Sequence, residues 1–193
     1  MYILEDVLQL LQSIFKAANS DRVWKRSVPY SLLYFMENLH KLSTAAFVLY
    51  EHHHSLEEAV KEEPGETEGF ITLIRCCVHK RRGDNVWTCL PRNLGLQQFC
   101  NPYKAIHKYC RYLTETEWKS FFAEIQEYAL CQSSIADLHP PYDLLTIHKR
   151  LLQLTEACHL LEVRVNIPMR EQLKKQEKDN QSNTIFHQTV QNE

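Results

Sequence analysis

The sequence predicts a single all-α domain, a compact set of about five to seven helices over residues 1–165. Two observations carry that prediction. Glycine occurs only four times in 193 residues, whereas sheet-rich folds place glycine at many of their turns. Apolar residues recur at three- and four-residue steps along much of the chain, which is typical of helices that pack on a core. A chain of this length can bury a sizeable core, so its stability requires no disulfide, metal or cofactor.

Two helices are predicted in the first part of the chain. Residues 4–18 place their apolar positions on one side of a helix. The next helix begins at Pro29, because proline suits the first helical turn, and its periodicity extends as far as Lys61. Ser55 and Glu58 fit a capping box. They allow an alternative in which this helix breaks at the preceding histidines and restarts.

The segment between residues 61 and 90 is the least regular. Residues 61–69 are rich in glutamate, proline and glycine and predict a solvated loop. Residues 70–78 are apolar and partly β-branched, and residues 86–90 are compatible with an extended strand after a turn at Arg82–Asn85. We expect a helix followed by a loop rather than a hairpin, because an isolated two-stranded ribbon is only marginally stable.

Three more helices are predicted in the second half of the chain. Asn101–Pro102 combines a capping residue with a helix-starting proline. Thr114 and Glu117 form a second capping box, followed by an apolar face. Pro140–Pro141 ends that region, and the last long helix begins near Leu144. Each start signal is local in sequence, so each helix is assigned independently of the others.

Residues 166–193 predict a polar tail, separate from the helical domain. Lys, Gln, Glu and Asn dominate there, and few apolar residues are available for burial, so we expect partial disorder. Ile185 and Phe186 are neighbouring apolar residues in this polar setting. We interpret them as a candidate docking segment for a partner.

Charge is distributed unevenly along the chain. The net charge is −2, but residues 71–112 hold eight Lys and Arg and one Asp, whereas the segments before and after are net acidic. We call residues 71–112 the basic segment, and its cations are the candidate partner-binding residues. They are Arg75, Lys80, Arg81, Arg82, Arg92, Lys104, Lys108 and Arg111. Three of them, Lys104, Lys108 and Arg111, follow helical spacing and predict one positive stripe.

Three ligands of the basic segment are compatible with this pattern. An acidic protein partner is the leading interpretation. The chain's own acidic loop, Glu58–Glu68, directly precedes the segment and is a second. Nucleic acid is a third, because aromatic residues that can stack on bases are interleaved with the cations. They are Trp87, Phe99, Tyr103, Tyr109 and Tyr112. Tyr109 and Tyr112 fall on other sides of the predicted helix, where a place in the core is expected.

Recognisable catalytic and phosphate-cradling motifs are missing from the sequence. The four glycines are scattered, and no serine has the glycine spacing of a nucleophile elbow. A zinc site is one alternative, although its candidate ligands lack the paired spacing that is usual in structural zinc sites. These candidates are Cys76, Cys77, His79, Cys89 and Cys100. A reactive thiol beside His79, His107 or His159 is a further alternative. We expect instead that these cysteines are buried, reduced thiols.

The sequence therefore predicts a non-enzymatic adaptor or scaffold subunit that presents helical grooves and a basic face to other proteins. We expect a cytoplasmic or nuclear location, because seven cysteines accompany no recognisable export signal. No apolar run is long enough for a bilayer. The partner is expected to be acidic or part of a multisubunit complex, and no cofactor, metal or small-molecule substrate is inferred. A nucleic-acid-binding module is the alternative, and a zinc- or thiol-dependent enzyme is a third hypothesis.

Overall fold

The computed structural model describes residues 4–20, 24, 29–52, 90–131, 133–135 and 143–166. Within these ranges the chain forms six α-helices, one π-helical segment and no strand, which confirms the predicted all-α class. They are α1 (Leu4–Ala18), α2 (Pro29–Glu51), α5 (Leu96–Cys100), α6 (Tyr103–Cys110), α7 (Glu115–Leu130), α8 (Leu144–Leu161) and η4 (Glu162–Asn166). None of the described helices combines the length and the apolar character that crossing a bilayer requires.

Local capping explains where three helices begin. Thr114 Oγ1 accepts a hydrogen bond from Glu117 N (3.3 Å), and the Glu117 carboxylate accepts one from Thr114 N (2.7 Å), so the predicted capping box at the start of α7 is confirmed. The Asp143 carboxylate caps α8 by accepting from the first backbone N–H groups of that helix. Before α6, whose N-cap residue is Pro102, Asn101 Oδ1 accepts from Tyr103 N (3.1 Å), the first backbone donor of that helix. Each cap pairs backbone donors that the helix leaves without a partner.

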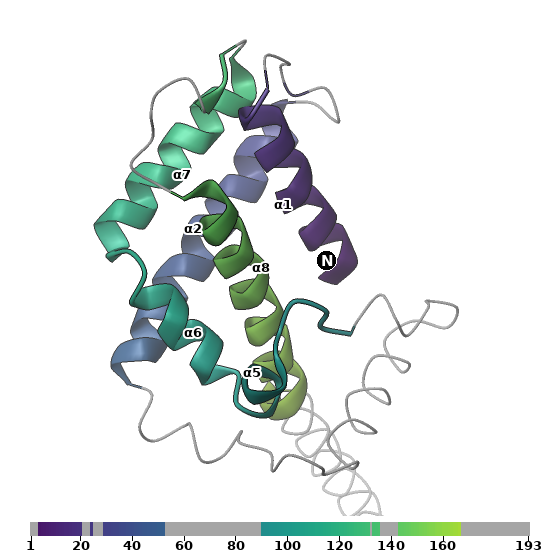
Figure 1. The fold of residues 1–193 in the computed structure, drawn as a ribbon, viewed down its shortest axis with the longest axis vertical. Coiled ribbons are helices and arrows are strands. Elements are labelled where there is room, and N and C mark those ends of the chain that lie inside the picture. Colours follow the sequence, from purple (N-terminus) through teal and green to yellow (C-terminus); the bar gives the residue numbers. More distant parts are fainter. Residues whose placement is uncertain are drawn as a thin grey trace, which may run out of the picture.

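Helix α8 crosses the middle of the view in Figure 1. It packs against α1 and α6, while α7 packs against α1 and α2, and α2 also contacts α6. The short α5 lies against α6 and α8. The side of α8 that faces these neighbours is fully buried at Ile147, Leu151, Leu154 and Ala157. Their three- and four-residue spacing is the apolar stripe by which a helix packs on a core.

Large aromatic side chains fill the space between α2, α6 and α7. Trp118 is fully buried and stacks on Tyr109, with ring centroids 4.2 Å apart. The Tyr109 hydroxyl is 2.7 Å from Ser43 Oγ, so the buried phenol has a hydrogen-bond partner on α2. Desolvation raises the pKa of Tyr109 above its usual value. The expected core position of Tyr109 is confirmed, because the ring lies inside the bundle rather than on the basic face.

The main difference from the expected order of elements is α5, which the sequence analysis did not assign. This helix has only five residues, from Leu96 to Cys100, too few to show a helical period. Helix α2 is described to Glu51. The expected continuation to Lys61, the alternative capping box, the acidic loop and the helix or hairpin of residues 70–89 lie outside the described residues. So does the predicted polar tail of residues 166–193, apart from Asn166, which ends η4.

Candidate functional site

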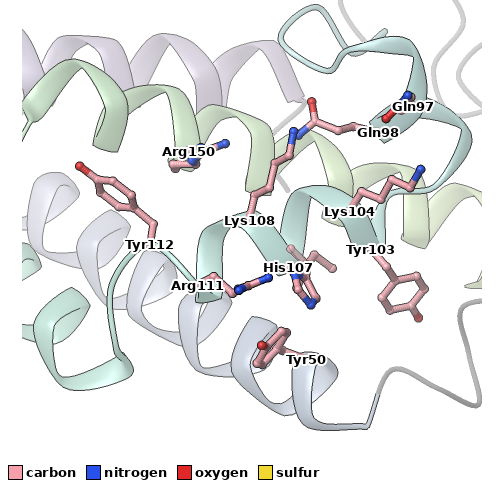
Figure 2. A pocket seen from close by; sticks show the side chains of 11 residues that line it. Tyr50, Gln97, Gln98, Tyr103, Lys104, His107, Lys108, Arg111, Tyr112 and Arg150 are labelled. Atoms are coloured by element: carbon pink, nitrogen blue, oxygen red, sulfur yellow. The ribbon is translucent and has the colours of Figure 1, made fainter.

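A pocket of about 630 Å³ opens between the end of α2, α5, α6 and α8. Figure 2 shows its side chains, which come from all four helices. The lining residues are Tyr50, Gln97, Gln98, Tyr103, Lys104, Ile106, His107, Lys108, Arg111, Tyr112 and Arg150. We call this cavity the basic pocket. It is the part of the described structure where residues of the basic segment gather around a concave surface.

Four of the residues that line the basic pocket are cations. Lys104 and Lys108 are exposed on α6 and Arg111 is exposed directly after it, and the three line the cavity together, as their helical spacing predicted. Arg150 joins them from α8, although it lies outside the basic segment in sequence. Among the described residues, no Asp or Glu lines the pocket. Like charges held together without interleaved acids raise the local concentration of anions.

The other predicted cations are not part of this pocket as described. Arg92 points elsewhere, toward α1, where its guanidinium lies 3.3 Å from a carboxylate oxygen of Glu5. The Arg92 side chain is half exposed, so this ion pair contributes little to stability. Arg75 and the triplet Lys80–Arg82 lie outside the described residues, as does the acidic loop Glu58–Glu68 that was a candidate partner within the chain.

The tyrosines of the basic pocket are largely occupied by contacts within the protein. Tyr50 meets the His107 ring edge-on, with centroids 4.9 Å apart. Tyr103 is only 6% exposed, and Tyr112 is half-buried. Phe99, another aromatic residue of the basic segment, packs under the Arg164 guanidinium at 5.1 Å. A nucleic-acid base that stacks on an aromatic side chain needs an accessible ring face. The faces of these rings are largely covered by other side chains.

A buried carboxylate holds the loop that leads into α5. Glu156, on α8, is fully buried. Its Oε1 accepts hydrogen bonds from Arg92 N (2.9 Å) and Asn93 Nδ2 (2.7 Å), and its Oε2 accepts from Asn93 N (2.7 Å) and Leu94 N (3.1 Å). Four donors therefore meet the two oxygens of one side chain, whose lone pairs can accept all four hydrogen bonds. Glu156 ties this loop, and α5 after it, to α8.

A second polar side chain of α8 connects the loop to the pocket wall. Gln153 Nε2 donates to Asn93 O (3.1 Å) and to Gln98 Oε1 (3.3 Å). Arg150 Nη1 donates to Gln153 Oε1 (3.3 Å). Arg150 and Gln98 are thus positioned by hydrogen bonds that reach across from α8 to α5. Sequence reasoning missed these residues, because polar residues on a helix ordinarily indicate a solvated face.

The thiol and zinc hypotheses receive no geometric support in the part of the chain that is described. Among those residues, no group of three His, Cys, Asp or Glu side chains has a metal-binding arrangement. Of the five zinc candidates only Cys100 is described, and it is a buried free thiol. Desolvation raises the pKa of the Cys110 and Cys158 thiols to about 12. Such thiols are largely protonated at neutral pH and poorly nucleophilic.

A second hollow, of about 360 Å³, lies between α1, α2 and α8. Its lining is mostly apolar and includes Leu4, Val7, Phe35 and Leu39, with Tyr34 exposed at one side. None of the cations of the basic pocket lines this hollow. The described bundle therefore has an apolar groove and a basic pocket at different places on its surface.

Comparison with protein-family models, with curated proteins and with solved structures finds no match to this chain.

Proposed function

We propose that this protein is a non-enzymatic interaction subunit that binds an acidic segment of a protein partner in the basic pocket. One observation carries the proposal: Lys104, Lys108, Arg111 and Arg150 converge on one cavity that no described carboxylate lines. Complementary charge steers association and selects partners. A concave, cationic surface built on rigid helices suits an extended acidic peptide, whose side chains reach the cations from one side.

A nucleic-acid ligand is the second candidate, favoured by the three tyrosines among the lining residues. Their burial and their ring contacts count against it, because stacking on bases supplies much of the affinity for single strands. An acidic peptide uses the same cations and needs no free ring face. The acidic protein partner is therefore the stronger proposal.

Charge reversal at the pocket tests the proposal directly. A variant with Lys104→Glu, Lys108→Glu and Arg111→Glu is compared with a matched control carrying Lys41→Glu, Lys119→Glu and Lys149→Glu. The control lysines are exposed and do not line the pocket. Both variants change the net charge equally, so a general electrostatic effect moves both. Binding is measured by fluorescence anisotropy with a labelled peptide rich in Asp and Glu, and with a labelled single-stranded RNA.

We expect the peptide to bind the unmodified protein and the control variant. The pocket variant should no longer bind it. Affinity capture from cells with the same three proteins should show partners that disappear only with the pocket variant. Equal loss of peptide binding in the pocket variant and the control variant would show that net charge, not the pocket, attracts the peptide. Tighter binding of the RNA, with a steep salt dependence, would instead support the nucleic-acid candidate.

A further inference from the structure

Two residues that line the basic pocket each carry a buried hydrogen-bond donor that has no partner among the described residues. These donors are Gln98 Nε2 and Arg150 Nε. Gln98 is only 5% exposed. Buried donors are paired in most protein interiors, and an unpaired one needs an explanation. Two of them belong to residues that line one cationic cavity, where a bound ligand would supply the missing acceptor.

The orientation of the Gln98 amide is fixed by its neighbours. Gln98 Oε1 accepts a hydrogen bond from Gly95 N (3.1 Å) and another from Gln153 Nε2 (3.3 Å). A backbone N–H can only donate, so the oxygen of the amide must face Gly95. Rotating the amide to exchange its two ends would bring donor against donor. The Nε2 group is therefore the end left for a ligand.

Lys108 is a second donor among the residues that line the pocket. In Figure 2 the Lys108 side chain extends toward the Gln98 amide, and both residues line the pocket. An ammonium and an amide N–H₂ are both donors, so they do not satisfy each other. Lys108 is exposed on a flexible stem, so its ammonium can adjust its position to an oxyanion bound at Gln98 Nε2. An oxyanion there accepts from both.

The number of cations and donors favours a phosphate monoester. Such a group carries a charge of about −1.5 to −2 at neutral pH and three acceptor oxygens, and arginine and lysine clusters recognise it through charge-assisted hydrogen bonds. A carboxylate has one charge and two oxygens. A phosphodiester within a nucleic-acid strand is substituted on both sides, so it reaches a recessed donor such as Gln98 Nε2 less readily than a terminal group does.

We infer that the basic pocket binds the phosphate of a phosphorylated serine or threonine within an acidic segment of a protein partner. This inference rests on the proposed function, and it adds the chemical group that the pocket selects. Gln98 Nε2 and Arg150 Nε contact the phosphate oxygens at the wall, while Lys104, Lys108 and Arg111 neutralise the phosphate and its acidic neighbours.

The test uses the full chain and three short fluorescent peptides of one acidic sequence, with phosphoserine, serine or glutamate at the centre. Gln98→Glu replaces the donor by an oxygen and keeps an acceptor for Gly95 N. Gln97→Glu is its matched control, because Gln97 also lines the pocket but is exposed. We expect the phosphoserine peptide to bind at least about tenfold more tightly than the other two. Gln98→Glu should abolish that preference, whereas Gln97→Glu should weaken all three peptides and keep it.

Further arms identify the source of the phosphate and guard against misfolding. Inorganic phosphate should displace the phosphoserine peptide, and a short single-stranded RNA should bind more weakly than that peptide. Circular dichroism checks that Gln98→Glu folds. If it does not, Arg150→Lys keeps the positive charge, removes the Nε donor and should also lower the preference.

The outcomes separate this inference from the proposed function. Equal binding of all three peptides would leave the acidic partner in place and overturn the phosphate, as would a preference that Gln98→Glu and Arg150→Lys do not reduce. Failure of every peptide to bind would overturn both. RNA binding more tightly than the phosphoserine peptide would show that the phosphate belongs to nucleic acid and not to a protein.

Discussion

Replacing Glu156 should destabilise the protein more than any exposed carboxylate substitution. In Glu156→Gln, the remaining oxygen can accept from Asn93 N and Leu94 N, while the new amide N–H₂ faces Arg92 N. The Asn93 side chain can turn its amide oxygen toward the new N–H₂ group. The backbone N–H of Arg92 is then the one donor that loses its acceptor. A buried donor without a partner costs about 1–3 kcal/mol, so we expect the free energy of unfolding to fall by about 2 kcal/mol.

Glu156→Leu removes both oxygens and leaves three backbone N–H groups, those of Arg92, Asn93 and Leu94, without this acceptor. Water can reach part of this loop, so the expected loss is about 4 kcal/mol rather than three full penalties. Glu127→Gln on α7 is the control, because the Glu127 side chain is exposed. Its effect should stay within about 0.5 kcal/mol.

Urea unfolding followed by circular dichroism measures the three free energies. Hydrogen exchange of the amides of residues 92–94 measures the local effect, and it should accelerate in both Glu156 variants. The reasoning is refuted if Glu156→Leu unfolds at the same urea concentration as Glu127→Gln. It is also refuted if those amides exchange at unchanged rates, because the carboxylate then does not hold the loop.

Three further predictions concern buried groups of the bundle. Tyr109→Phe removes the hydroxyl that pairs with Ser43, so urea unfolding should show a loss of about 1 kcal/mol; no loss would mean that the bond is not formed in solution. Burial lowers the pKa of His148, so the folded state disfavours its protonation. The protein should therefore lose stability as the pH falls from about 6.5, the pKa of this histidine in the unfolded chain, toward its lower pKa in the folded protein. His148→Phe should reduce this dependence of the melting temperature on pH. Burial also raises the pKa of Cys110 to about 12, so a brief N-ethylmaleimide pulse with peptide mapping should label the exposed Cys131 before Cys110; faster labelling of Cys110 would contradict its burial.

The helices were predictable because their signals are local. A helix repeats its contacts every three or four residues, so the apolar positions of residues 4–18 indicate α1 without knowledge of its neighbours. The capping box of Thr114 and Glu117 marks the start of α7 for the same reason, since its partners are three residues apart. Helix α5 has five residues, too few for a period, and sequence reasoning therefore missed it.

The candidate site was predictable only in part. The stripe of Lys104, Lys108 and Arg111 follows from spacing on one helix, and the structure places all three around one pocket. Arg150 and Gln98 join them only because α8 and α5 pack against α6. Which helices meet depends on contacts between residues far apart in the chain, and periodicity within one segment carries no information about them.

Sequence by itself determined that this chain builds helices and where their apolar faces and basic stripe lie, since those properties are set by neighbours within a turn or two. Tertiary structure decided which polar residues turn inward. Glu156 and Gln153 look like ordinary members of a solvated helix face, yet both are buried because the loop before α5 brings its backbone donors and acceptors to them. A buried polar side chain is stable only beside its partner, and folding alone brings that partner near.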